Sequence, residues 1–195
     1  MQINSELVKK LREHTGAGMM DCKKFLAQAN GDYNKAVEIL RKEGQKIATK
    51  KASRGTANGL VDAYIHPGNR VGVLIEVACE TDFVSRNTEF KELVHDLAMH
   101  IAAFDPPYKE PQDVPKKLID KEKEIYSEQL KKEKKPAAII NKIVAGKLAK
   151  YYEENCLMKQ KFLKDDKKSI EQYLTEKIAK IGENIQIKKY IRFSL

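Results

Sequence analysis

The sequence predicts an α+β protein in which a small three-helix module precedes an antiparallel three-stranded sheet packed with helices. Three observations carry this prediction: helical periodicity near the N-terminus, an alternating hairpin pattern from Val61 to Val77, and a last alternating stretch at the C-terminus. We expect residues 1–44 to form the module, residues 45–58 a basic, solvated linker with a helical start as one alternative, and residues 59–195 the core domain.

Three short apolar stripes define the N-terminal module. Asn4-Ser5 is placed to cap the first helix, the glycine-containing segment 15–18 breaks it, and Gly31 ends the second. Asp32 caps a third helix, which we expect to end before Gly44. The pattern resembles the ubiquitin-associated three-helix fold. The positions at core spacing are Leu7, Val8, Leu11, Cys22, Phe25, Leu26, Ala29, Tyr33, Ala36, Val37 and Leu40.

Met19 and Met20 follow the glycine segment and cannot both face inward, because neighbouring side chains point in different directions. In one interpretation one Met packs and the other is an isolated exposed residue. In the other, both belong to an adaptable contact surface on a loop. The sequence leaves the two open.

The core begins with a hairpin whose turn is Pro67-Gly68-Asn69. We expect one buried face made of Val61, Ala63, Ile65, Val71, Val73, Ile75 and Val77. Tyr64 and Leu74 then fall on the open face, where Leu74 breaks the polar pattern and indicates a second contact surface, such as another subunit. A C-terminal strand, with Ile185, Ile187, Ile191 and Phe193 on one parity, is expected to pair with the hairpin.

Four further helices are predicted. A helix opened by Asn87-Thr88 and Glu89, with an apolar stripe from Phe90 to Ala102, covers the sheet. We place His95 and His100 on its surface because they lack metal-ligand spacing. Residues 116–135 and the helix after Pro136 form an antiparallel pair or a kinked arm. The last helix begins near Ile170 and stops at Gly182.

Composition limits the classes of function. The net charge of +9 admits an anionic partner, but lysines interleaved with glutamates favour general solvation over a nucleic-acid footprint. Three widely spaced cysteines indicate free thiols in a reducing cytosol. No apolar run approaches membrane-spanning length, and Met1 to Asn4 lead into a helix without a signal-peptide pattern. Phosphate-loop, dinucleotide and nucleophile-elbow motifs are absent, so we expect a protein that is not an enzyme.

The segment from Cys79 to Asn87 joins the second strand to the covering helix, so we expect an exposed turn there. Phe83 is unusual in such a place. It either folds back as a cap over Phe90 and the hairpin, or it is presented for insertion into a partner.

The motif ETDFVSRN at 80–87 closely matches the signature loop of bacterial elongation factor Ts, and LREHTGAGMMDCKK at 11–24 resembles that family's N-terminal signature. Segments 136–148, 156–160 and 180–187 are also similar, so the resemblance covers nearly the whole chain. Phe25 departs from it, since the family usually has a small residue there. The length corresponds to the family's short form.

The resemblance implies a cytoplasmic guanine-nucleotide exchange factor for elongation factor Tu. The loop Thr81-Asp82-Phe83-Val84 would enter between two helices of the partner's G domain and disturb its Mg²⁺ and phosphate site. No cofactor, membrane or direct nucleic-acid binding is expected, and short forms pair as homodimers, which implies a 2:2 complex. Further contacts carried over by position are Arg12, Met19, Met20, Asp21 and Lys23.

Two alternatives remain at this stage. The net charge allows a basic RNA- or ribosome-associated protein. The N-terminal module allows a ubiquitin-like-binding adaptor, whose activity would depend entirely on residues 1–44.

Overall fold

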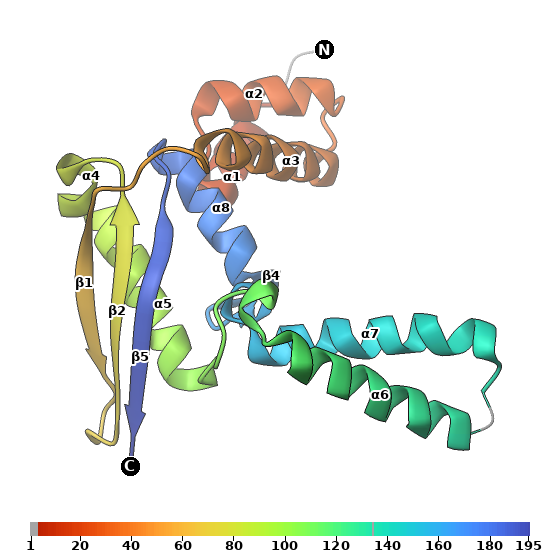
Figure 1. The fold of residues 1–195 in the computed structure, drawn as a ribbon. Helices are drawn as coiled ribbons and strands as arrows, with labels where there is room; N and C mark the ends of the chain where they lie inside the picture. The colour runs from red at the N-terminus through yellow and green to blue at the C-terminus, as the bar shows by residue number, and fades with distance from the viewer. Residues whose placement is uncertain (1–3, 134) are drawn as a thin grey trace. The chain divides into compact units, whose positions relative to one another are not determined.

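The α+β prediction is confirmed by the computed structural model, which describes residues 4–133 and 135–195. Met1 to Ile3, and position 134 of the predicted 116–135 helix, lie outside the described residues. The chain divides into two compact units, residues 1–102 with 172–195, and residues 103–171. Figure 1 shows the helices and strands of both units. No helix in the described ranges is both long and apolar enough to cross a membrane.

The N-terminal module contains α1 (Ser5–Thr15), α2 (Met19–Gln28) and α3 (Tyr33–Lys51). Its predicted caps are confirmed: Asn4 Oδ1 accepts from the Glu6 amide at 2.9 Å, and Asp32 Oδ1 from the Lys35 amide at 3.0 Å. The core of the three helices is formed by buried Leu11, Cys22, Leu26, Ala29 and Ala36.

The prediction that α3 ends before Gly44 was wrong, because the helix continues to Lys51. A single Gly lowers helix stability by only about 1 kcal/mol, and most residues that follow it, such as Gln, Lys and Ala, are good helix formers. A Cβ at position 44 would lie 3.6 Å from the Ala179 Cβ, an ordinary van der Waals distance, so the packing there does not require a glycine. The first half of the predicted 45–58 linker is therefore helical.

The main sheet contains β1 (Asn58–Ile65), β2 (Val71–Cys79) and β5 (Gln186–Ser194), all antiparallel, in the order β1-β2-β5. This confirms the predicted hairpin and its C-terminal third strand. The hairpin turn needs two residues with positive φ, which Gly68 (φ 92°) and Asn69 (φ 57°) supply.

The predicted facing of β1 was wrong. Tyr64 pairs with buried Val73 and Asp62 with buried Ile75, so these two residues lie on the helix-covered face. The turn fixes the pairing register, and a shift of one residue exchanges the two faces of a strand. Asp62 obtains a polar partner there, since its Oδ2 lies 3.2 Å from His95 Nδ1. Val61 and Ile65 are consequently exposed on the open face.

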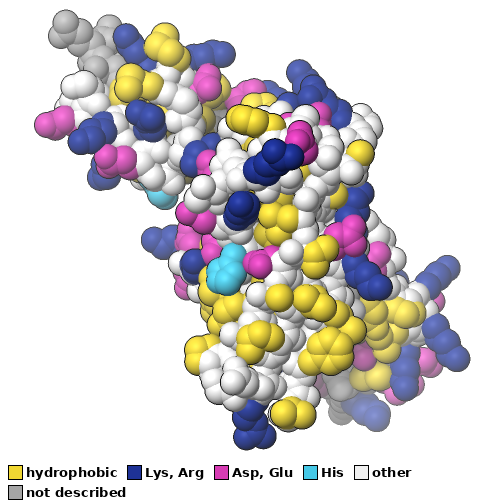
Figure 2. All heavy atoms as spheres, turned by 90° about the vertical axis from the view of Figure 1, so that its left-hand side faces the viewer, with side chains coloured by type: hydrophobic (Ala, Val, Ile, Leu, Met, Phe, Trp, Pro, Cys, Tyr) yellow, Lys and Arg dark blue, Asp and Glu magenta, His cyan; other side chains and the backbone are white. Residues whose placement is uncertain are grey.

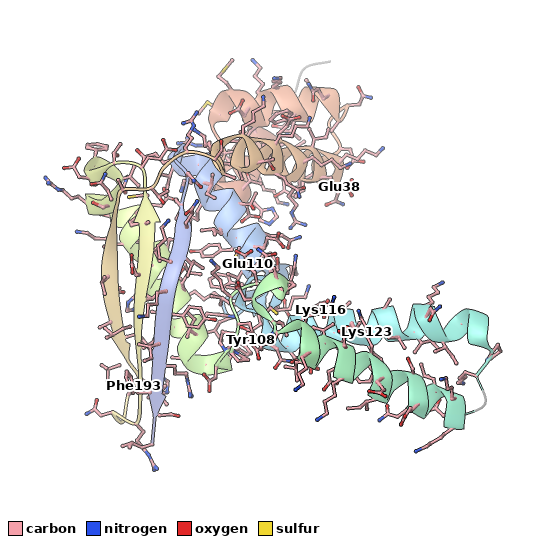
Figure 3. All side chains as sticks on the ribbon, in the orientation of Figure 1. Glu38, Tyr108, Glu110, Lys116, Lys123 and Phe193 are labelled. Atoms are coloured by element: carbon pink, nitrogen blue, oxygen red, sulfur yellow. The ribbon has the colours of Figure 1, made fainter. Side chains whose placement is uncertain are left out.

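The single parity predicted for β5 was also wrong. Ile187 pairs with Val77, but Lys189 pairs with the adjacent Glu76, so Lys188 is an extra residue in a β-bulge. The bulge reverses the parity of the strand beyond it. Ile187 is therefore buried, whereas Ile191 and Phe193 face outward with Leu74. Phe193 lies near the C-terminal end of β5 (Figure 3).

Helix α5 (Thr88–Phe104) covers the other face of the sheet (Figure 1). The assignment of His100 to the surface was wrong, because it is fully buried. His100 lies seven residues after Leu93, on the same helical stripe, which a search for apolar residues alone does not include. His95 is half-exposed, as expected.

Helix α8 (Ile170–Ile181) is linked to α5 by polar contacts. The Tyr173 hydroxyl donates to Asp96 Oδ2 at 2.8 Å. Lys177 and Lys180 both contact the Glu89 carboxylate, at 2.9 and 2.6 Å. The helix ends where predicted, with Gly182 at φ 86° and its amide donating to the Ile178 carbonyl.

The second unit is built on α6 (Lys116–Lys132) and α7 (Ala137–Asn155), which pack against each other as the antiparallel alternative predicted. Two 3₁₀ turns, Pro111–Asp113 and Leu157–Lys159, flank the pair. A short sheet of β3 (Lys161–Phe162) and β4 (Asp165–Ser169) was not predicted. The buried core of the pair is Val114, Ile119, Leu130, Ile140, Val144, Leu148 and Cys156.

Candidate functional site

The segment predicted as an exposed turn forms one short helix, α4 (Asp82–Arg86), between β2 and α5. Thr81 is its N-cap, and its Oγ1 accepts from the Val84 amide at 3.4 Å. Asn87 ends α4 and begins the next helix, since its Oδ1 accepts from the Glu89 amide at 2.8 Å. The start of α4 is therefore held by the Thr81 side chain, and its end by the Asn87 backbone amide, which donates to the Val84 carbonyl.

Phe83 and Val84 have opposite environments on this short helix. Neighbouring helical residues point about 100° apart. Val84 is 6% exposed and anchors α4 beneath, whereas Phe83 is 79% exposed. The interpretation of Phe83 as a cap over Phe90 is thus wrong, because a cap would bury its own ring. Phe83 projects from an anchored helix into solvent.

The charged residues beside Phe83 are also exposed. Asp82 Oδ2 lies 2.9 Å from an Arg86 guanidinium nitrogen, and both side chains are mostly in solvent. An exposed pair of this kind contributes little to stability. α4 therefore presents the Phe83 ring next to the Asp82 carboxylate, which can leave Arg86 and bond to another protein at little cost.

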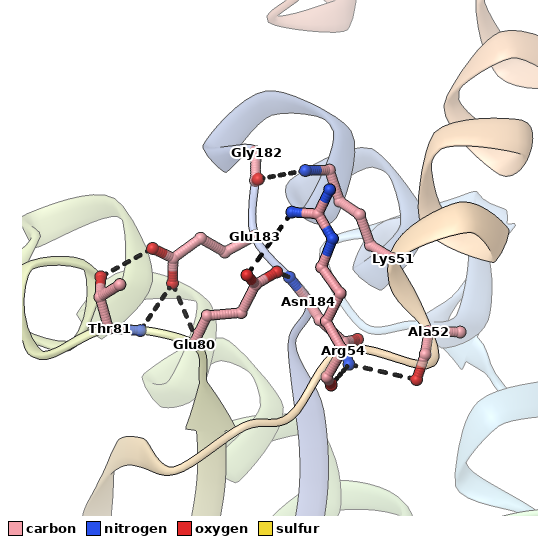
Figure 4. A network of polar contacts seen from close by, with 8 residues as sticks. All are labelled: Lys51, Ala52, Arg54, Glu80, Thr81, Gly182, Glu183 and Asn184. Atoms are coloured by element: carbon pink, nitrogen blue, oxygen red, sulfur yellow. Dashed lines mark hydrogen bonds and ion pairs between the residues drawn. The ribbon is translucent and has the colours of Figure 1, made fainter.

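Glu183 holds the start of α4 with three hydrogen bonds (Figure 4). Its Oε2 accepts from the Glu80 and Thr81 amides, each at 3.0 Å. Its Oε1 accepts from the Thr81 hydroxyl at 2.7 Å. The carboxylate comes from the turn between α8 and β5, more than a hundred residues away in the sequence.

A second carboxylate, Glu80, ties the same turn down from the other side. Its Oε1 accepts from the Asn184 amide at 2.6 Å, and its Oε2 lies 3.5 Å from Arg54. The Asn184 amide and the Arg54 guanidinium hold the pKa of Glu80 below its usual range. Burial, followed by the nearby Glu183 charge, raises the pKa of the adjacent Cys79 thiol.

The second predicted contact group lies where α1 meets α2. Arg12 is in the last turn of α1, and the others open α2; all are exposed. Met19 is 58% and Met20 75% exposed, so the interpretation in which one of them packs is wrong. They lie on the first turn of a helix rather than on a loop. The others in this group are Asp21 and Lys23.

Sequence reasoning missed the residues that hold α4. The segment after α3 was expected to be a solvated connector, but Arg54 contacts Glu80, and the carbonyls of Ala52 and Arg54 accept from the Asn184 amide group at 3.3 and 2.8 Å. The only sequence signal for these contacts was the polar pair Glu183-Asn184, which lies between the apolar residues Ile181 and Ile185. Asn184 is 2% exposed.

No cluster of three or more metal-ligating side chains was found among the described positions, 4–133 and 135–195. The polar residues around α4 bond to one another and to the backbone. The arrangement is suited to presenting a side chain to another protein.

Comparisons with known proteins show the family of this chain. A family described as "Elongation factor TS" matches residues 3–195. The chain belongs to the elongation factor Ts family. It is 53% identical to the elongation factor Ts of Thermosipho melanesiensis over 193 residues, covering 99% of this chain and 98% of that protein. It is also 53% identical to that of Fervidobacterium nodosum over 195 residues, covering 100% and 99%.

A third relative, the elongation factor Ts of Pseudothermotoga lettingae, is 53% identical over 192 residues, with 98% of this chain and 97% of that protein covered. Membership over almost the full length identifies the chain as a translation elongation factor.

Proposed function

We propose that this protein is a guanine-nucleotide exchange factor for elongation factor Tu. The observation that carries the proposal is Phe83, 79% exposed on an anchored helix within the family's signature motif. A large exposed aromatic residue held by a rigid support is the kind of residue that dominates the binding energy of an interface. In this proposal it inserts, together with Asp82, into the partner's G domain, while Thr81 and the buried Val84 set the shape of α4 and flank the contact.

Exchange follows from thermodynamic linkage. GDP in such a G domain is held by phosphate-loop amides, a lysine and Mg²⁺. A protein that binds the nucleotide-free partner more tightly must weaken nucleotide binding by the same factor. Insertion of Phe83 and Asp82 between two helices would disturb the Mg²⁺ and phosphate site, and GDP would leave without a covalent step. The protein would therefore need no cofactor of its own and would not be an enzyme.

A second contact would come from the N-terminal module. The exposed Met19 and Met20 provide soft apolar surface, which adapts to a partner without a fixed shape. Exposed charges flank them, and these would orient the partner more than they would add affinity. The flanking residues are Arg12, Asp21 and Lys23.

We further propose a homodimer formed through the open face of the main sheet. Hydrophobic side chains gather over the sheet on the face that Figure 2 turns toward the viewer. The same patch on two copies can cover itself around a two-fold axis. Two chains would then bind two partner molecules in the cytoplasm. The exposed apolar residues of this face are Val61, Ile65, Leu74, Ile191 and Phe193.

The decisive experiment is release of a fluorescent GDP from elongation factor Tu, followed with and without this protein. We expect release to accelerate and to saturate with protein concentration. Unchanged release would overturn the proposed function. A charge-driven RNA protein would instead lose binding steeply with salt and keep it in Phe83→Ala. A ubiquitin-like-binding adaptor would lose all activity without residues 1–44, whereas the exchange factor would only be weakened.

A further inference from the structure

We propose that Glu183 is a positioning residue for exchange: its carboxylate pre-forms α4 and so holds Phe83 in the orientation that enters the partner. This inference rests on the proposed function. It assigns a role to a side chain that is distant in sequence from the signature motif and need not touch the partner.

The Thr81 hydroxyl connects Glu183 to the helix. A hydroxyl has one proton to donate and lone pairs with which to accept. The Thr81 proton points to Glu183 Oε1 at 2.7 Å, so a lone pair is left facing the Val84 amide, whose donor atom is 3.4 Å away. Glu183 thereby fixes the rotation of the hydroxyl in the state that caps α4.

The two backbone bonds act in the same direction. Glu183 Oε2 accepts from the amides of Glu80 and Thr81, which are the last residues before α4. Three donors from two consecutive residues therefore converge on one carboxylate. A helix of five residues is too short to be stable by itself, because helix nucleation costs more than a single turn returns. These three hydrogen bonds to Glu183 supply the missing stability from outside the helix.

The Glu183 turn is itself fixed. Gly182 adopts φ 86°, which only glycine does easily, and its carbonyl accepts from Lys51 Nζ. Asn184 is buried, and its side-chain amide donates to the carbonyls of Ala52 and Arg54 (Figure 4). The carboxylate is thus aimed by a turn that is bonded to the end of α3, which makes it a rigid support rather than an incidental contact.

The fraction of molecules in which the turn is formed sets how tightly the protein binds its partner. If the binding-competent turn is populated in only a fraction of molecules, the apparent dissociation constant rises by the inverse of that fraction. A turn that is formed about a tenth of the time without Glu183 would raise the half-saturating concentration about tenfold. Tenfold corresponds to about 1.4 kcal/mol, the size of one or two net hydrogen bonds. The maximal rate of GDP release should be unchanged, because the molecules that do bind insert the same Phe83.

The test compares Glu183→Ala, which removes all three hydrogen bonds, with Glu38→Ala, which removes a carboxylate from an exposed position on α3 (Figure 3). We expect Glu183→Ala to raise the half-saturating concentration about tenfold at an unchanged maximal rate, and Glu38→Ala to match the wild type. In the isolated protein, amide hydrogen exchange should accelerate at Thr81 and Val84 and stay unchanged across β2 and α5.

Three results would overturn the proposal. Wild-type protection at the Thr81 and Val84 amides in Glu183→Ala would mean that the turn forms without the three Glu183 hydrogen bonds. Uniformly faster exchange across β2 and α5 would show a role in global stability. A lower maximal rate with an unchanged half-saturating concentration would mean that Glu183 acts on the GDP-release step itself and does not position α4 for binding. The amide measurement needs no partner, so it stands even if the wild type fails to accelerate GDP release.

Discussion

Replacing Phe83 by Ala tests whether its exposure serves binding. The ring is 79% exposed in the free protein, so its removal should change the free energy of unfolding by less than about 0.5 kcal/mol. Burying a Phe side chain is worth about 1.5–3 kcal/mol. If the partner buries most of this ring, Phe83→Ala should weaken binding by about 2–3 kcal/mol, or roughly 30- to 150-fold.

Val84→Ala tests a buried residue of the same helix, where the change should lower stability. Val84 is 6% exposed, and deletion of two buried methylene equivalents costs about 1.6 kcal/mol before any cavity contribution. We expect it to lower the melting temperature by several degrees. Phe104→Ala, which removes a half-exposed Phe at the end of α5, serves as the control for loss of an aromatic ring.

The assay is stopped-flow release of fluorescent GDP from elongation factor Tu, titrated with each variant, together with thermal unfolding followed by circular dichroism. Wild-type release by Phe83→Ala would refute the insertion argument. Thermal destabilisation of Phe83→Ala as large as that of Val84→Ala would refute the structural premise, since it would mean that the ring packs in the native state.

Three further predictions concern other regions. If the proposed dimer forms through the open face of the sheet, Leu74→Asp should give a monomer of unchanged fold, measured by light scattering, whereas Leu163→Asp, at the same 46% exposure, should not; a wild-type mass of one chain would contradict the proposed dimer. The depressed pKa of Glu80 gives stability that is present above its ordinary pKa of 4.5 and lost as pH falls through the lowered value. Glu80→Gln should therefore show a shallower loss of melting temperature on acidification, and equal slopes would exclude this linkage. Tyr173→Phe should cost about 1.5–3 kcal/mol in denaturant unfolding, because Asp96 loses a hydroxyl donor at 2.8 Å; no change would mean that the bond contributes nothing.

The helices and strands of this protein were largely predictable because their signals are local. Asn4, Asp32 and Asn87 cap helices through side chains that bond within a few residues, and Gly182 ends one through its own φ. The hairpin turn at Gly68 is local in the same sense. Such signals require no knowledge of the rest of the chain.

The facing of the sheet was not predictable, because it depends on register. The alternation of Val61 and Ile65 is the same whichever way β1 turns, and only pairing with β2 decides it. The bulge at Lys188 reverses the outer half of β5 without any change in the alternation of apolar residues. The apolar open face therefore belongs to the tertiary structure.

The sequence by itself determined the α+β class, the order of the main elements, an exposed connection after β2 and, through its motifs, the family. The tertiary structure alone decided that Phe83 faces solvent while Val84 is buried. It alone brought Glu183 to Thr81, across about half of the chain. The physical reason is that capping and periodicity are properties of neighbouring residues, whereas burial and long-range hydrogen bonds exist only once distant segments have packed.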